Sequence, residues 1–131
     1  MVTRWLGYAL CFAVLLPSTT RAQEPARTAA QIDPVAVSPV RFTVLLENRR
    51  VRVVEYVLLP GQRDQWHTHP PKVSYVIAGG TLRITTEDGR SFLANEKRGS
   101  ATWMDALGRH FAENVGKTPV RILLVEVKDA P

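Results

Sequence analysis

The sequence contains a single cysteine among its 131 residues, Cys11, and it lies in the N-terminal segment. A chain with one thiol forms no internal disulfide, so core packing has to stabilise the fold without cross-links. Beyond the N-terminal segment, the sequence also lacks any apolar stripe of ten or more residues at helical spacing. These two absences argue against a disulfide scaffold and against a helical bundle, and they leave a core built from short apolar runs.

Concentrated positive charge is also absent, although the formal net charge is +5. The basic residues are scattered, and only 49–52 and 97–98 form clusters. A nucleic-acid surface is typically a basic stripe interleaved with aromatic residues. We therefore expect no nucleic acid among the partners.

The N-terminal segment has the pattern of a secretory signal peptide. Arg4 precedes the apolar run 5–16, and Thr20-Arg21-Ala22 fits a cleavage site before Gln23. The apolar run is too short to span a membrane. Residues 1–22 are thus predicted to be removed, which makes the mature protein periplasmic or secreted and not membrane-bound.

The remaining chain predicts an all-β domain over residues 40–128, preceded by a flexible lead-in at 23–39. Short runs rich in Val, Ile, Thr and aromatic residues alternate with turn signals every eight to twelve residues or so. The predicted strands are 41–46, 50–59, 65–69, 73–78, 81–86, 91–94, 101–104, 109–115 and 120–127. This pattern favours a sandwich or barrel of about 9–10 antiparallel strands in one domain.

The three histidines of the chain, His67, His69 and His110, form a candidate metal site. Residues i and i+2 of a strand point to the same face, so His67 and His69 project together, and His110 comes from another predicted strand. Imidazoles that converge from two strands hold zinc or a first-row transition metal in many proteins. The alternative is that the pair lies at a strand end and His110 is a surface residue.

The spacing of these histidines resembles the two sequence motifs of the cupins. Residues 61–69 match G(x)5HxH, and residues 99–114 match the spacing of G(x)5PxG(x)2H(x)3N, with Asp105 and Leu107 in place of the Pro and the second Gly. The resemblance covers residues 40–128 and looks like the small single-domain bacterial cupins. It implies a conical jelly-roll barrel with one divalent transition metal (Fe, Mn, Ni, Cu, Co or Zn) held by the three histidines in its mouth.

One departure from the cupin pattern concerns the carboxylate ligand that usually follows the HxH pair. Counting back from Gly79 places this position at Lys72, and counting back from Gly80 places it at Val73. Neither residue is a carboxylate. A three-histidine site without it carries one more positive charge, which favours an anionic or chelating ligand.

Three classes of function are compatible with such a site. Its ligand set resembles those of the thiol dioxygenases and the diketone-cleaving dioxygenases among the cupins, which implies a metal-dependent enzyme. A periplasmic small-molecule binder without catalysis and a structural cupin with a relict site are the alternatives, and a homodimer is possible. We predict Lys72 and Tyr75 as catalytic candidates. Four aromatic residues are predicted to wall the substrate pocket: Trp66, Tyr75, Trp103 and Phe111.

Overall fold

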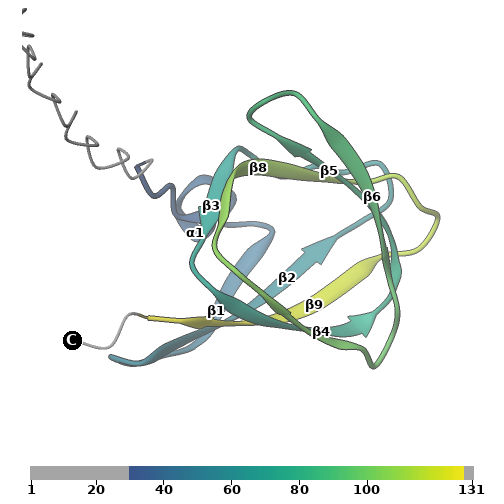
Figure 1. Cartoon of the computed structure of the whole chain (residues 1–131). Coiled ribbons are helices and arrows are strands. Elements are labelled where there is room, and N and C mark those ends of the chain that lie inside the picture. The colour runs from purple at the N-terminus through teal and green to yellow at the C-terminus, as the bar shows by residue number, and fades with distance from the viewer. Residues whose placement is uncertain (1–29, 129–131) are drawn as a thin grey trace, which may run out of the picture.

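The computed structural model describes residues 30–128, which form two antiparallel sheets wrapped into a barrel (Figure 1). A four-residue helix, α1 (Pro34–Val37), precedes the strands. The strands are β1 (Phe42–Glu47), β2 (Val51–Leu58), β3 (His67–His69), β4 (Lys72–Ala78), β5 (Gly80–Thr86), β6 (Ser91–Glu96), β7 (Ala101–Met104), β8 (Leu107–Asn114) and β9 (Val120–Val127). The predicted all-β class is confirmed, and each predicted run overlaps one of these strands.

The strand order brings the two ends of the domain together. One sheet has the order β1-β2-β9-β4-β7 and the other has the order β3-β8-β5-β6. The last strand, β9, therefore lies between β2 and β4. The strands of the two candidate motifs are also neighbours, because β3 pairs with β8 and β4 pairs with β7.

The core follows from the two-residue alternation of the strands. Val54, Tyr56 and Leu58 of β2 are buried while the residues between them are only half-buried, and Val120, Ile122 and Leu124 of β9 repeat the pattern. One face of each strand therefore points into the barrel. Continuing this alternation places Arg52 and Glu126 on the inner face as well, directly paired on neighbouring strands.

Two glycines at the beginnings of the candidate motifs make turns that other residues adopt only with strain. Gly61 has φ of 76° and Gly99 has φ of 82°, both in the left-handed region. Glycine lacks the Cβ that makes this region costly, so it suits these turns. The turn at Gly61 leads toward β3 and the turn at Gly99 leads into β7.

The predicted lead-in at 23–39 is described only from residue 30 onward, and the predicted signal peptide lies outside the described residues. From residue 30, the segment contacts the barrel. The amide of Ile32 donates to the Thr68 hydroxyl, and Asp33 caps α1 and pairs with Arg52. No helix within residues 30–128 is long and apolar enough to cross a membrane.

Candidate metal centre

The three histidines lie together on the inner face of the four-stranded sheet. His67 of β3 is paired directly with His110 of β8, and His69 follows two residues later, after a register shift. All three side chains are buried. Their potential ligand atoms lie within 4.8 Å of one another. The predicted convergence is therefore present, and none of the three is a surface residue.

Hydrogen bonds orient each imidazole so that Nε2 faces the other two rings. Nδ1 of His67 lies 2.7 Å from the Gln65 carbonyl oxygen, and Nδ1 of His110 lies 2.7 Å from the Gly108 carbonyl oxygen. A carbonyl oxygen only accepts, so each Nδ1 carries the proton and donates it. The neutral rings then present the Nε2 lone pair, which is how metal-binding histidines are usually oriented.

His69 is oriented by a carboxylate from the opposite sheet. Its Nδ1 lies 2.8 Å from Oε1 of Glu126, and Oε2 of Glu126 accepts from Nε of Arg52 at 2.6 Å. Burial opposes ionisation of Glu126, but the hydrogen bonds from His69 and Arg52 outweigh it and lower the pKa of Glu126. Glu126 is thus an ionised carboxylate that accepts from His69 and links the two sheets beneath the site.

The distance between two of the ligand atoms fits a bound cation. Nε2 of His67 and Nε2 of His69 are 3.1 Å apart. With both Nδ1 atoms protonated, two neutral rings would face each other through lone pairs at hydrogen-bonding distance. Two nitrogens bound to one metal at about 2.0–2.1 Å would be about 2.9–3.4 Å apart. The residues present therefore fit a metal ion, and a modest movement of the rings would bring all three nitrogens to bonding distance.

The environment keeps the imidazoles neutral at neutral pH. Burial is the main reason that all three pKa values are lowered, to about 3 for His69 and about 4 for His110. The positive charge of Lys72 lowers all three further. Because a metal binds the deprotonated ring, this environment removes proton competition at neutral pH.

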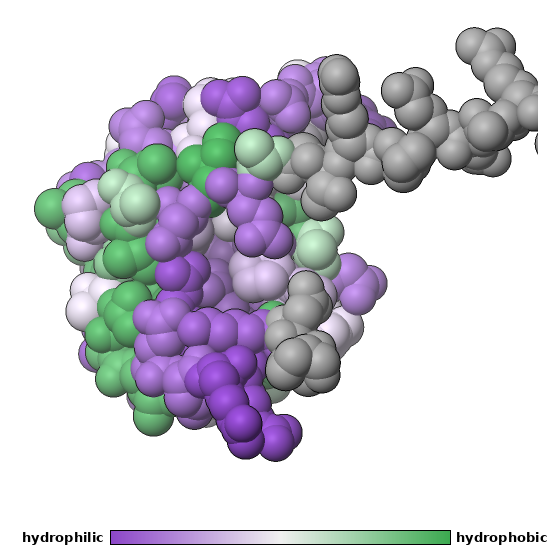
Figure 2. All heavy atoms as spheres, turned by 90° about the vertical axis from the view of Figure 1, so that its left-hand side faces the viewer, coloured by the Kyte–Doolittle hydropathy of each residue, from purple (hydrophilic) through white to green (hydrophobic). Residues whose placement is uncertain are grey.

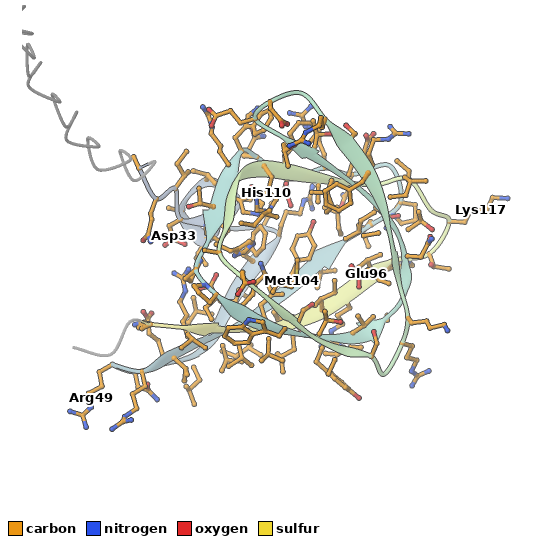
Figure 3. All side chains as sticks on the ribbon, in the orientation of Figure 1. Asp33, Arg49, Glu96, Met104, His110 and Lys117 are labelled. Carbon is orange, nitrogen blue, oxygen red and sulfur yellow. The ribbon has the colours of Figure 1, made fainter. Side chains whose placement is uncertain are left out.

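A small cavity in the barrel interior adjoins the histidines. Its volume is about 100 Å³, and His69, His110 and Lys72 line one part of it. Its other polar neighbours are Asp64, Tyr56, Ser74 and Glu96. Apolar side chains, including those of Leu82, Ile84, Phe92, Met104, Ile122 and Leu124, form the rest of the wall. Figure 3 shows His110, Met104 and Glu96 within the outline of the barrel, whereas Lys117 and Arg49 extend away from it.

A larger, polar groove lies outside the barrel, on the side of α1. Its volume is about 420 Å³, and it is bordered by Asp33, Thr68, Arg52 and Glu126. Figure 2 views the molecule from this side and shows a hollow surrounded mainly by hydrophilic residues. The groove reaches the Arg52–Glu126 pair from outside and does not include the three histidines.

The four aromatic residues predicted to wall the pocket do not line the cavity, which corrects that prediction. Trp66 and Phe111 alternate with His67 and His110, so they lie on the outer face, where their rings contact edge to face at 4.7 Å. Tyr75 and Trp103 alternate with Ser74 and Met104 and are 44% and 55% exposed. Tyr75 therefore points away from the cavity in which it was predicted to act.

The two residues predicted to be catalytic, Lys72 and Tyr75, lie on opposite faces of β4. Lys72 is 3% exposed and faces the cavity, although a lysine after two prolines is usually a solvated loop residue. Val73 lies on the other face, paired with Val125 and Trp103. Lys72 and Val73 were the two positions that could correspond to the usual cupin carboxylate. Only Lys72 points into the barrel.

Three charged residues near the histidines were missed by the sequence reasoning. Glu126 and Arg52 are described above, and Asp64 accepts from the Tyr56 hydroxyl at 2.8 Å and from the Ala112 amide at 2.8 Å. The signal for Glu126 was available, since it continues the buried alternation of an otherwise apolar strand. Asp64 precedes β3 and had no comparable pattern.

Comparisons with known proteins support the fold. No family model and no curated protein matches the sequence. A cupin domain from Bordetella pertussis Tohama I superposes with a TM-score of 0.62 at 28% identity, over 67% of this chain and 92% of that chain. An RmlC-like cupin family protein with a double-stranded β-helix fold, from Methanocaldococcus jannaschii, gives 0.54 at 16% identity, over 66% and 77%. A polyketide cyclase from Streptomyces resistomycificus gives 0.50 at 19%, over 69% and 66%.

The two-sheet barrel and these likenesses show that the described residues adopt the cupin fold, a small double-stranded β-helix. Its particular feature is the cluster of His67, His69 and His110, which could hold a metal ion. Fold alone does not determine activity, because cupin-like folds serve unrelated functions.

Proposed function

We propose that this cupin binds one divalent transition metal through His67, His69 and His110, and acts as a dioxygenase-type enzyme on a small anionic or chelating substrate. The observation that carries the proposal is the orientation of the rings. Each Nδ1 donates to an acceptor outside the cluster, and each Nε2 faces inward. A bound metal would supply open coordination positions and Lewis acidity for a substrate and dioxygen.

The residues around the histidines favour an anionic ligand. Three neutral imidazoles leave the charge of a divalent metal uncompensated, and Lys72 adds a positive charge nearby. The nearest carboxylate, Glu126, is held by His69 and Arg52. Apolar side chains form much of the cavity wall and lower the local dielectric constant, which strengthens electrostatic interactions with a bound anion. Lys72, whose pKa burial lowers to about 8, is also suited to hold or release a proton near neutral pH.

Metal reconstitution and oxygen uptake test this function. The purified protein is stripped with a chelator, loaded separately with Fe, Mn, Ni, Cu, Co or Zn, and measured with an oxygen electrode against small carboxylates and diketones. The expected result is one metal per chain and oxygen uptake with at least one metal and substrate. Saturable ligand binding with no turnover would support the alternative of a small-molecule binder. Absence of metal would make the site a relict.

Export remains part of the proposal and rests on the sequence pattern of residues 1–22. We expect the mature protein to begin near Gln23 in the periplasm or medium. N-terminal sequencing of the exported form tests this, and intact Met1 in the soluble cytoplasmic fraction would contradict it.

A further inference from the structure

Lys72 and Ser74 are adjacent inward-facing residues of β4, and both border the barrel cavity. They are 3% and 7% exposed. As residues i and i+2 of a strand, their Cα atoms are about 6.6 Å apart and their side chains share one face. A cation and a hydroxyl are thus presented side by side to the same small space.

Neither polar group is occupied by the protein. The Lys72 ammonium and the Ser74 hydroxyl make no hydrogen bond or ion pair within residues 30–128, and Glu126 acts on Lys72 only through its charge. Both carboxylate oxygens of Glu126 are taken, by His69 and by Arg52. No fully enclosed polar side-chain atom of the described part lacks a partner, so Nζ and Oγ must open onto the cavity.

A buried ammonium without an acceptor is unfavourable unless a ligand supplies one. We propose that Lys72 and Ser74 hold the carboxylate of a small monocarboxylic acid whose apolar body lies against Leu82, Ile84 and Phe92. The proposal deepens the proposed function and rests on it for the role of the acid as substrate, but binding of the carboxylate itself does not require the metal.

The size and lining of the cavity limit the ligand. About 100 Å³ has room for a few water molecules or an acid of about five non-hydrogen atoms. Typical ligand pockets are about 300–1,000 Å³, so the cavity by itself holds only a small ligand. Glu96 and Asp64 also border the cavity, and burial raises the pKa of each carboxyl group.

Three probes of similar size separate the possible ligand chemistries. Propionate carries the carboxylate, propionamide has the same shape without charge, and propylammonium is a cation that Glu96 would attract. Binding of each to the purified protein is measured by ligand-observed NMR and calorimetry at pH 7, in the metal-free form and in the zinc-loaded form. We expect propionate to bind to both forms, and the other two probes to bind at least about tenfold more weakly.

Variants locate the binding group. Lys72→Met should weaken propionate binding about tenfold or more, since a hydrogen bond to a charged group is lost. Ser74→Ala should weaken it by a smaller factor. Lys117→Met is the matched control, because it removes the same charge from an exposed lysine that points away from the barrel (Figure 3). Circular dichroism verifies the fold, and if Lys72→Met does not fold, Ser74→Ala and Lys72→Arg take its place.

The outcomes distinguish this inference from the metal proposal. The proposed carboxylate site is overturned if wild type binds propionate in neither form. It is also overturned if Lys72→Met binds propionate as well as wild type does, or if wild type prefers propylammonium. Lys72-dependent binding of propionate to a protein that takes up no metal would support the carboxylate site while refuting the proposed enzyme.

Discussion

Burial of the Lys72 ammonium should destabilise the metal-free protein by a measurable amount. Burial lowers the pKa of Lys72 from 10.5 to about 8, although the charge of Glu126 opposes the shift. One pKa unit corresponds to about 1.36 kcal/mol, so the shift amounts to about 3 kcal/mol. Lys72→Met removes the charge and retains a flexible apolar side chain, and the variant should be more stable by up to that amount at pH 7.

The pKa shift of Lys72 also determines how the stability difference between wild type and Lys72→Met changes with pH. Between about pH 8 and 10.5 the unfolded chain keeps the Lys72 proton while the folded protein releases it, so the unfolded state binds more protons. The stability of wild type relative to Lys72→Met should therefore rise through this range, and the full penalty should be present below pH 8. Tyr56, whose pKa burial raises, titrates in both proteins and cancels in the difference.

Urea unfolding at a series of pH values measures this difference. The protein is metal-free and the buffers contain no carboxylate, because a ligand for Lys72 would mask its cost. Lys117→Met serves as the control and should follow wild type at every pH. A flat difference between pH 7 and 10.5, or a variant that is less stable than wild type at pH 7, would refute the reasoning.

Three further substitutions test other parts of the account. Glu126→Gln should weaken metal binding about 10–100-fold, measured by calorimetry, because it removes the charge that orients His69; unchanged affinity would contradict that role. Asn114→Ala should lower the free energy of unfolding by about 2–3 kcal/mol, since the buried amide bridges two carbonyl groups and accepts from a backbone amide; a loss below 0.5 kcal/mol, taken as roughly the size of a surface change, would count against it. Gly79→Ala should lower the free energy of unfolding by about 1–3 kcal/mol, because a Cβ there collides with the Glu96 carbonyl oxygen. A thermal midpoint equal to that of wild type would contradict this prediction.

The strands were predictable because each apolar run is short and bounded by turn residues. His67 and His69 were predictable as a pair because two-residue alternation fixes their common face. The convergence of His110 with them came from the resemblance to a motif, since residues far apart in the chain meet only through strand order. The pairing of β3 with β8 supplies that order.

The residues that line the pocket were predicted less well, because the prediction did not follow the face of the strand on which each side chain lies. Trp66, Tyr75, Trp103 and Phe111 are large and apolar, but each alternates with an inward-facing residue and so lies on the outer face. The charged residues of the barrel interior were missed because charged side chains are usually expected to face solvent. Lys72 and Glu126 occupy inward positions that composition assigns to solvent, and only the register of β4 against β9 places them side by side.

The central claim is that the three inward Nε2 atoms bind one divalent metal. It is tested most directly by elemental analysis and calorimetry of the untagged protein at neutral pH, for wild type, His110→Ala and the control Lys117→Met. Wild type and the control should bind one metal per chain and gain about 2.7 kcal/mol of stability when free metal is 100 times its dissociation constant. His110→Ala should lose both the metal and the gain while keeping its β-sheet signal. Absence of binding by wild type to any of Fe, Mn, Ni, Cu, Co and Zn would contradict the account.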